Sequence, residues 1–243
     1  MGKSIPVLLV TGAPGVGKTT LVKEMGEQLF HAGVAHAVVD IDELARVRPA
    51  VPDEGVWAEL TVANLRVMWP NYEALGVERV ILAGIVQSAA IIDAYRAAIP
   101  GSDLTVVRLR ASVDTLHARL QHREPGSVRT FLLGVTASLD TEIADLDVED
   151  LTVDNDPDQP IGDLARGILE WLGWLRGDGP GSPLQNAAGV SAKAAVLGAE
   201  MGEGQQAAMI TGAADEHEAI GDRRLHPDAR RPPRVPSAVS SKD

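Results

Sequence analysis

Residues 7–21 read Val7-Leu-Leu-Val-Thr-Gly-Ala-Pro-Gly-Val-Gly-Lys-Thr-Thr-Leu21, and this stretch decides the fold. The apolar run at its start predicts a buried strand, and the residues after the glycines predict a helix. Residues 12–19 match G-x-x-x-x-G-K-[ST], which is the pattern of a phosphate-binding loop. The match lies between a predicted strand and a predicted helix, which is the context that this loop requires.

Each residue type in the loop has a physical reason. Gly12, Gly15 and Gly17 permit backbone torsions and close approaches that a Cβ would block, so that successive N–H groups can turn inward around an anion. The helix that begins near Gly17 adds its positive N-terminal end. Lys18 supplies a cation for the phosphates, and the Thr19 hydroxyl is a candidate ligand for Mg²⁺. The predicted nucleotide-binding residues of the loop are Gly12, Ala13, Pro14, Gly15, Val16, Gly17, Lys18, Thr19 and Thr20. The alternative is a glycine-rich turn that precedes Lys-Thr by chance.

Composition limits the classes of function. The chain has 243 residues, a net charge of −12 and no cysteine. An acidic chain argues against a surface that binds nucleic acid, and the absence of cysteine excludes disulfides. No apolar stretch approaches the roughly 20 residues of a membrane span. We therefore expect a cytoplasmic protein without a nucleic-acid or membrane partner, either a monomer or a homodimer.

The chain is predicted to divide near Arg176. Residues 177–243 contain no Trp, Tyr or Phe, and they have too little apolar surface to offset chain entropy, so a disordered tail is expected there. Residues 1–176 alternate between two patterns. Buried strands are predicted at 5–10, 35–39, 78–86, 103–109 and 150–153, and helices at 18–32, 56–75, 88–98, 112–122, 131–145 and 161–174. This alternation predicts an α/β domain with one parallel sheet that helices cover on both faces.

Acidic residues follow the second predicted strand, in Val38-Val-Asp40-Ile-Asp42-Glu-Leu44. The chain has no Asn-Lys-x-Asp motif of the kind that reads guanine, and no acid follows the strand at 79–86. The chain resembles the P-loop small-molecule kinases in three features. These are a phosphate loop near the N-terminus, the Asp-x-Asp motif after the second strand, and a later helix that ends in Arg-x-x-x-Arg. Shikimate, gluconate and adenylylsulfate kinases belong to this group, and chloramphenicol phosphotransferase and the nucleotide kinases are relatives. The resemblance covers residues 5–174 and implies a three-layer sandwich with strand order 2-3-1-4-5, and ATP and Mg²⁺ as cofactors.

Phosphoryl transfer gives the two carboxylates distinct roles. We expect Asp40, at the end of a strand beside that of the phosphate loop, to join Thr19 at Mg²⁺. Asp42 projects farther toward the acceptor and is the candidate group that orients or deprotonates its hydroxyl. The alternative is that these acids only cap the next helix.

Arginines cluster in the second half of the domain. Arg119 and Arg123 lie four residues apart on a predicted helix, and Pro125-Gly126 follows them. This pattern resembles the lid of the small-molecule kinases, with Arg119 at the nucleotide and Arg123 as a catalytic residue beside Lys18 and Asp42. Arg129 is a weaker candidate. The alternative is a solvated helix face on which these arginines pair with acids such as Asp114 or Glu124.

The segment 53–75 occupies the place of the acceptor-binding helices in this family. Asn64 and Arg66 are candidate contacts there, Pro70 is expected to kink or divide the helix, and Gln87 follows strand three. The expected reaction is transfer of the γ-phosphate of ATP to a hydroxyl of a small molecule. A nucleotide-dependent switch or accessory ATPase, or an enzyme that has lost its acceptor site, is the alternative.

Overall fold

The structure is a computed structural model that describes residues 4–47, 54–123, 126–176 and 191–192. Its elements alternate between strands and helices along the chain, as the sequence predicts. The strands are β1 (Ile5–Thr11), β2 (His36–Asp40), β3 (Arg79–Ala83), β4 (Ser102–Arg110), β5 (Leu151–Asp154) and β6 (Ser191–Ala192). The helices are α1 (Lys18–His31), α2 (Ile41–Leu44), α3 (Glu54–Ala74), α4 (Ala89–Ala98), α5 (Val113–Arg123), α6 (Gly126–Asp145) and α7 (Ile161–Trp171).

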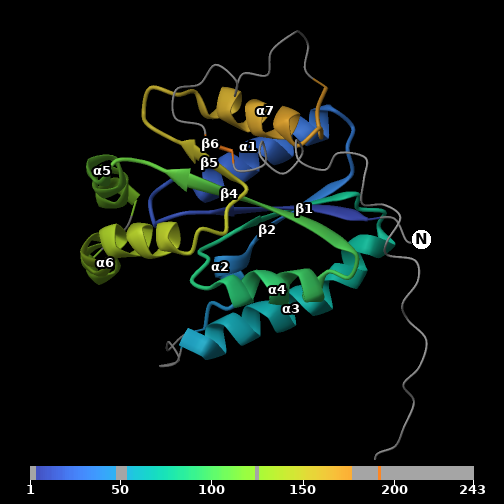
Figure 1. Cartoon of the computed structure of the whole chain (residues 1–243), viewed down its shortest axis with the longest axis horizontal. Coiled ribbons are helices and arrows are strands. Elements are labelled where there is room, and N and C mark those ends of the chain that lie inside the picture. The colour runs from blue at the N-terminus through green and yellow to red at the C-terminus, as the bar shows by residue number, and fades with distance from the viewer. Residues whose placement is uncertain (1–3, 48–53, 124–125, 177–190, 193–243) are drawn as a thin grey trace, which may run out of the picture. The chain divides into compact units, whose positions relative to one another are not determined.

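Five of the strands form a parallel sheet in the order β2-β3-β1-β4-β5 (Figure 1). The order implied by the kinase resemblance is therefore confirmed. The sheet also has a sixth strand, because β6 pairs antiparallel with β5 through Leu151↔Ala192 and Thr152↔Ser191. A strand of two residues has no detectable periodicity, so the sequence could not predict it. The rest of the predicted tail, 177–190 and 193–243, lies outside the described residues.

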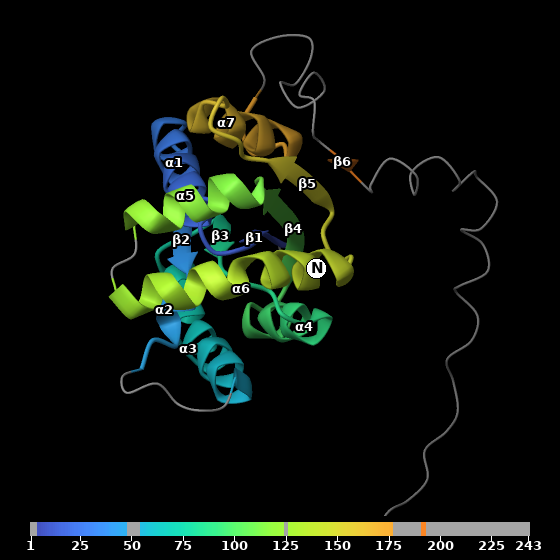
Figure 2. The same cartoon turned by 90° about the vertical axis from the view of Figure 1, so that its left-hand side faces the viewer.

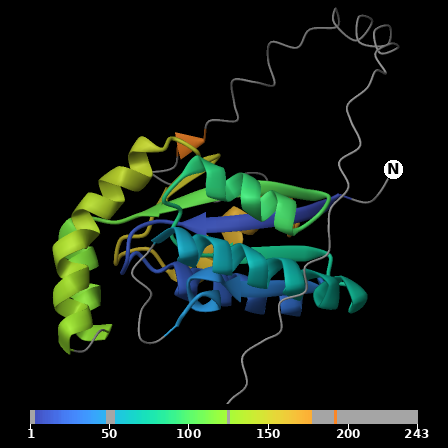
Figure 3. The ribbon, with the colours of Figure 1, turned by 90° about the horizontal axis from the view of Figure 1, so that it is seen from below.

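The two faces of β1 belong to different parts of the core. Leu8 and Val10 pack into a cluster with residues of α1 and α7, whereas Val7 and Leu9 pack into a cluster with residues of α3 and α4. Figures 1 and 3 show these helix pairs on opposite sides of the sheet. A central strand that is covered on both faces must be apolar at successive positions, which explains the run at 7–10.

Two helices lie at the end of the sheet rather than over a face. The arrowhead of β4 points toward α5 and α6 in Figure 1, and Figure 2 shows both helices in front of the sheet's end. The carboxyl ends of parallel strands form the crevice where ligands bind in open α/β sheets. The helices α5 and α6 therefore border the region in which the phosphate loop and the acidic residues after β2 are placed.

Three local expectations need correction. β3 lies between β2 and β1, so Asp40 does not end a strand adjacent to that of the phosphate loop. α3 continues through Pro70, so of the two expected effects of this proline, division of the helix is wrong. α6 begins at Gly126 instead of residue 131, because its first turn is polar and carries little periodic signal. Among the helices within the described ranges, none has both the length and the apolarity needed to cross a bilayer.

The core contains a buried ion-pair cluster around Arg108 of β4. Its guanidinium lies 3.2 Å from an Asp140 carboxylate oxygen and 3.7 Å from one of Glu149, and it also donates to the Asp140 carbonyl at 3.1 Å. The side chains of Arg108 and Glu149 are 7% and 9% exposed. Arg108 therefore connects the sheet to α6, and it does not belong to the predicted arginine lid.

Replacing Arg108 with alanine should lower the free energy of unfolding by about 3–5 kcal/mol, because the buried Glu149 carboxylate loses its cation. Arg110→Ala is the matched control. Arg110 pairs with Asp154 at 2.7 Å, but the two side chains are 44% and 27% exposed, so its loss should cost about 0–1 kcal/mol. Urea unfolding of the two variants measures the difference. Equal effects would contradict a structural role specific to Arg108.

Two truncations test how much the C-terminal residues contribute to stability. Deleting residues 193–243 should leave the melting temperature unchanged, since it preserves β6. Deleting residues 180–243 also removes the backbone pairing between β5 and β6, which is worth about 1 kcal/mol per hydrogen bond. We therefore expect a melting temperature a few degrees lower for the longer deletion only. A large loss with the shorter deletion would show that residues after 192 stabilise the fold.

Candidate phosphate and acceptor site

The loop between β1 and α1 has the backbone that its glycines predict. Gly12, Gly15 and Gly17 have φ values of 142°, 83° and 104°, which L-residues rarely adopt. A Cβ on Gly12 would stand 2.5 Å from the Leu109 carbonyl oxygen. The loop therefore runs against β4 more closely than a side chain would allow, and α1 begins directly after it at Lys18.

Two residues distant in sequence brace this loop. Asn155, 4% exposed at the end of β5, donates its side-chain amide to the Val16 carbonyl at 2.8 Å. Arg119 of α5 donates to the same carbonyl at 3.3 Å and to the Asn155 carbonyl at 2.9 Å. In this structure the Arg119 guanidinium therefore connects the phosphate loop to the residue that follows β5. Sequence reasoning did not assign Asn155 to the site, although its place directly after the strand predicted at 150–153 was a usable signal.

Lys18 is buried at the start of α1. Its Nζ donates to the carbonyls of Gly12 at 2.9 Å and Ala13 at 3.4 Å. Burial lowers the pKa of the Lys18 ammonium below its ordinary value, while Asp42 and Asp40 oppose that shift. The cation is thus held against the loop, with the two acids of the Asp-x-Asp motif as its nearby counter-charges.

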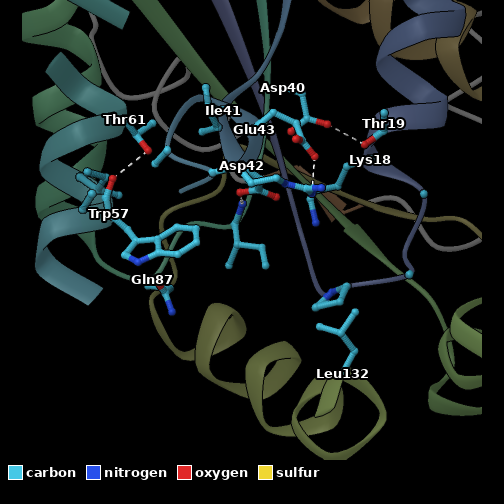
Figure 4. Close-up of a pocket in the computed structure, with 18 of the residues that line it drawn as sticks. Lys18, Thr19, Asp40, Ile41, Asp42, Glu43, Trp57, Thr61, Gln87 and Leu132 are labelled. Carbon is cyan, nitrogen blue, oxygen red and sulfur yellow. Dashed lines mark hydrogen bonds and ion pairs between the residues drawn. The ribbon is translucent and has the colours of Figure 1, made fainter. Parts of the chain in front are cut away.

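Thr19 and Asp40 meet at the edge of the loop. The Thr19 hydroxyl donates to Oδ2 of Asp40 at 3.0 Å, and Figure 4 shows this contact beside Lys18. Hydroxyl and carboxylate oxygens are ligands that Mg²⁺ prefers, and Mg²⁺ is commonly held by one or two protein groups together with phosphate oxygens. The pair fits that requirement. The described residues contain no group of three or more His, Cys, Asp or Glu side chains able to hold a metal ion by themselves.

Asp42 lies in the short helix α2 and faces the same space. Its Oδ1 accepts a hydrogen bond from the Ile85 backbone N–H at 3.0 Å. The cavity walls withdraw the carboxyl from bulk water, and this burial raises the pKa of Asp42 above its ordinary value, with Lys18 opposing the shift. The side chain remains accessible from the cavity. A carboxylate in such a place is a competent hydrogen-bond acceptor for a ligand hydroxyl.

These residues share one cavity of about 930 Å³. Lys18, Thr19, Asp40 and Asp42 line its phosphate-loop side, and Trp57 and Thr61 of α3 line another side (Figure 4). Residues after β3, on α4 and on α6 complete it. They include Ile85, Gln87, Ser88, Ile91, Tyr95, Val128 and Leu132. The cavity therefore extends from the phosphate loop into a compartment that a nucleotide triphosphate chain alone would not need.

A second cavity of about 310 Å³ adjoins the loop. Gly15, Gly17 and Thr20 line it together with Arg119 and residues after β5, which are Asn155, Asp156, Pro157, Gln159 and Ile161. It does not include Asp40 or Asp42. The phosphate loop thus has one cavity beside its acidic residues and another between α5 and the segment that follows β5.

The structure separates the other candidates. Arg123 lines both cavities, whereas Arg129 is exposed and donates to the Gln121 carbonyl at 3.4 Å. Asn64 donates to the Leu44 carbonyl at 2.6 Å and so holds α2 against α3. Arg66 is exposed and does not line either cavity. Sequence reasoning did not assign Tyr95, Val128 or Leu132 to the site, because apolar and aromatic residues on helices predict core positions.

This chain is similar to known proteins at two levels, a family model over its first residues and solved structures over most of its length. The family model of the methylmalonyl Co-A mutase-associated GTPase MeaB matches residues 2–49. No curated protein sequence matches the chain. The structure of the Mycobacterium tuberculosis APS kinase, solved with AMPPNP and APS, is 18% identical with a TM-score of 0.51, over 71% of this chain and 99% of that one.

Two other solved structures are similar. The Deinococcus radiodurans tunicamycin resistance protein is 16% identical with a TM-score of 0.50, over 70% of this chain and 96% of that one. A gluconokinase from Sinorhizobium meliloti 1021 is 21% identical with a TM-score of 0.48, over 71% and 94% of the two chains. The strand order, the phosphate loop and the likeness to the APS kinase structure together show that this chain has the fold of the P-loop small-molecule kinases.

Proposed function

We propose that the protein is a phosphotransferase that moves the γ-phosphate of ATP to a hydroxyl of a small molecule. The observation that carries this proposal is the single cavity in which Lys18, Thr19 and Asp40 stand beside Asp42 and a further compartment. A protein that only binds and hydrolyses a nucleotide has no need of that compartment. The APS kinase, whose solved structure holds AMPPNP and APS, supports the proposal through its fold.

Each residue has a task in this reaction. The backbone N–H groups of the phosphate loop and the Lys18 ammonium bind the phosphates and balance their negative charge. The Asp42 carboxylate accepts a hydrogen bond from the acceptor hydroxyl and so orients the hydroxyl oxygen toward the γ-phosphate. The same carboxylate takes the hydroxyl proton as transfer proceeds. Arg123, which lines both cavities, would contact the phosphates from the α5 side. The smaller cavity is the proposed place of the nucleotide base.

Mg²⁺ is the metal that Thr19 and Asp40 would hold. When bound, it neutralises charge on the phosphate oxygens. Thr19 offers its hydroxyl directly, and Asp40 holds that hydroxyl through the 3.0 Å hydrogen bond. Both groups are positioned before any ligand arrives, since the contact joins the first turn of α1 to the end of β2.

Replacing Asp40 with asparagine should raise the Mg²⁺ concentration that gives half-maximal activity by about tenfold or more, the usual effect of losing such a group. Asparagine keeps an oxygen that can accept from Thr19, so the fold should be preserved. Titrating Mg²⁺ at saturating ATP measures the effect. An unchanged Mg²⁺ dependence would remove Asp40 from the metal site.

The direct test of the proposal is an acceptor screen. ATP consumption is measured with purified protein and panels of hydroxylated small molecules, and phosphorylated product is identified by mass spectrometry. We expect at least one class of alcohol to raise ATP consumption well above hydrolysis in buffer, with the phosphate recovered on the alcohol. Hydrolysis that no alcohol changes would contradict the proposal.

The match of residues 2–49 to MeaB favours a second candidate, a GTP-dependent switch. That segment spans β1, the phosphate loop, α1 and the acids after β2, all of which either function would use. The chain lacks an Asn-Lys-x-Asp motif, which argues for ATP over GTP. Competition binding with ATP and GTP separates the two, because a switch of this kind should bind GTP far more tightly.

A further inference from the structure

The part of the large cavity that lies away from the phosphate loop, next to Asp42, is lined largely by apolar side chains. The following inference about its ligand rests on the proposed function. We propose that the acceptor is an uncharged, hydroxylated molecule that carries an aromatic or alkyl portion. Its hydroxyl lies at Asp42, and its apolar portion lies between Trp57 of α3 and the Val128–Leu132 face of α6.

The walls of this compartment are largely apolar. α3 contributes Trp57 and Ala58, and α6 contributes Val128 and Leu132. Figure 4 shows the Trp57 ring and Leu132 entering from different helices around Asp42. Ile85 and Ile91 complete the apolar lining. Ligand sites bury most of a ligand's surface against such side chains, so a bare polyol would leave these walls without apolar contacts.

The α6 wall is unusual because its apolar residues face open space. Val128 and Leu132 are four residues apart and therefore share a helix face. Val128 is 46% exposed, and Leu132 is partly exposed. Both line the cavity instead of packing into the two core clusters. A ligand with an apolar portion would cover this face of α6. Removing the apolar surfaces of the helix and the ligand from water would favour binding.

The carboxylate of Asp42, at the proposed transfer position, opposes an anionic group on the acceptor there. Among the described residues, the cations that line the cavity are Lys18, Lys23, Arg46 and Arg123. Lys18 is held at the loop, Arg46 is ion-paired with Glu43, and Arg123 also lines the second cavity. A carboxylate or sulfate near the transfer position would meet the negative charge of Asp42, which lines the cavity.

A few polar side chains in the compartment can orient a bound ligand. Asp42, Gln87 and Thr61 line it together with Tyr95, whose side chain is 3% exposed. Burial and the neighbouring Asp42 raise the pKa of Tyr95, so its hydroxyl keeps its proton and can donate to a ligand oxygen. In an otherwise apolar site, a small number of placed polar groups fixes the orientation of the ligand.

Matched triplets of probes test the proposal. The first is para-nitrophenyl β-D-glucopyranoside, methyl β-D-glucopyranoside and para-nitrophenyl β-D-glucuronide. The second is uridine, methyl β-D-ribofuranoside and orotidine. Within each triplet, one partner loses the aromatic portion and the other carries a carboxylate, which replaces the primary hydroxyl in the glucuronide and is added to the base in orotidine. Binding is measured by calorimetry on the full chain with Mg²⁺ and a non-hydrolysable ATP analogue, and transfer is measured separately with ATP.

We expect the uncharged aromatic member of at least one triplet to bind about tenfold more tightly than both partners. Trp57→Ala and Leu132→Ala should each remove most of that advantage. Phe131→Ala is the matched control, because Phe131 lies on α6 at 65% exposure and does not line the cavity. It should leave the preference unchanged.

The outcomes separate the two proposals. Tighter binding of a methyl glycoside or a carboxylate member, a preference that survives Trp57→Ala and Leu132→Ala, or no binding in either triplet would overturn the acceptor class. Transfer to an anionic alcohol would overturn the class while supporting the phosphotransferase. Preferential binding of the aromatic members without transfer to any alcohol would support the class and contradict the phosphotransferase.

Discussion

Replacing Lys18 with alanine should reduce phosphoryl transfer by roughly 10²–10³-fold or more, the usual loss when a preorganised group that stabilises developing charge is removed. Lys18 donates to the Gly12 and Ala13 carbonyls, so its cation is fixed at the loop before ATP binds. The Lys18 side chain therefore needs little rearrangement when the phosphates of ATP bind. The measurement is single-turnover transfer at saturating ATP, with nucleotide affinity determined in parallel.

Lys18→Met separates charge from packing. Methionine keeps most of the apolar stem in the buried position and removes only the ammonium. Both variants should lose transfer to a similar extent, while their melting temperatures should stay near that of the wild type because the cation serves the loop and not the hydrophobic core. Wild-type turnover in Lys18→Met would show that the loop does not use this lysine on phosphates.

The fold was predictable from the sequence wherever consecutive residues carry the pattern that determines an element. The loop motif needs only eight consecutive residues, and β1 shows its burial in a single apolar run. The strand order came from the resemblance to kinases, since periodicity cannot say which strands are neighbours. The structural role of Arg108 was not predictable, because its partners Asp140 and Glu149 lie more than 30 residues away in sequence. Pairing at that separation leaves no local pattern.

The candidate site was predictable on its phosphate side and not on its acceptor side. Lys18, Thr19, Asp40 and Asp42 were named from the sequence because each belongs to a short motif with a chemical reason. Arg119, expected at the nucleotide, lines the second cavity, and its hydrogen bonds also join the loop to Asn155. The acceptor compartment is made by Trp57, Val128 and other apolar residues from separate helices. Such residues become a site only when tertiary structure brings them together around a carboxylate.

Replacing Asp42 with asparagine should lower phosphoryl transfer by roughly 10²–10⁴-fold, the range for a lost acid–base group, and leave ATP affinity within a few-fold. Asparagine has the same shape and retains an oxygen for the Ile85 N–H, which Asp42 accepts at 3.0 Å. The variant therefore removes the charge that orients and deprotonates the acceptor while preserving the connection between α2 and the segment after β3. Transfer must be measured with an acceptor identified by the screen.

Glu43→Gln is the control for this substitution. It removes the same charge one residue along α2, from a side chain that lines the same cavity but is ion-paired with Arg46, so transfer should change far less than in Asp42→Asn. The comparison with Asp40→Asn then tests the division of labour within the Asp-x-Asp motif. Loss of Asp40 should be rescued in part by added Mg²⁺, since its effect passes through the metal site, whereas added Mg²⁺ cannot replace a group that accepts the acceptor's proton. If Mg²⁺ restores both variants equally, the two acids share one role. If Asp42→Asn transfers phosphate at the wild-type rate, the acceptor hydroxyl is activated elsewhere in the cavity.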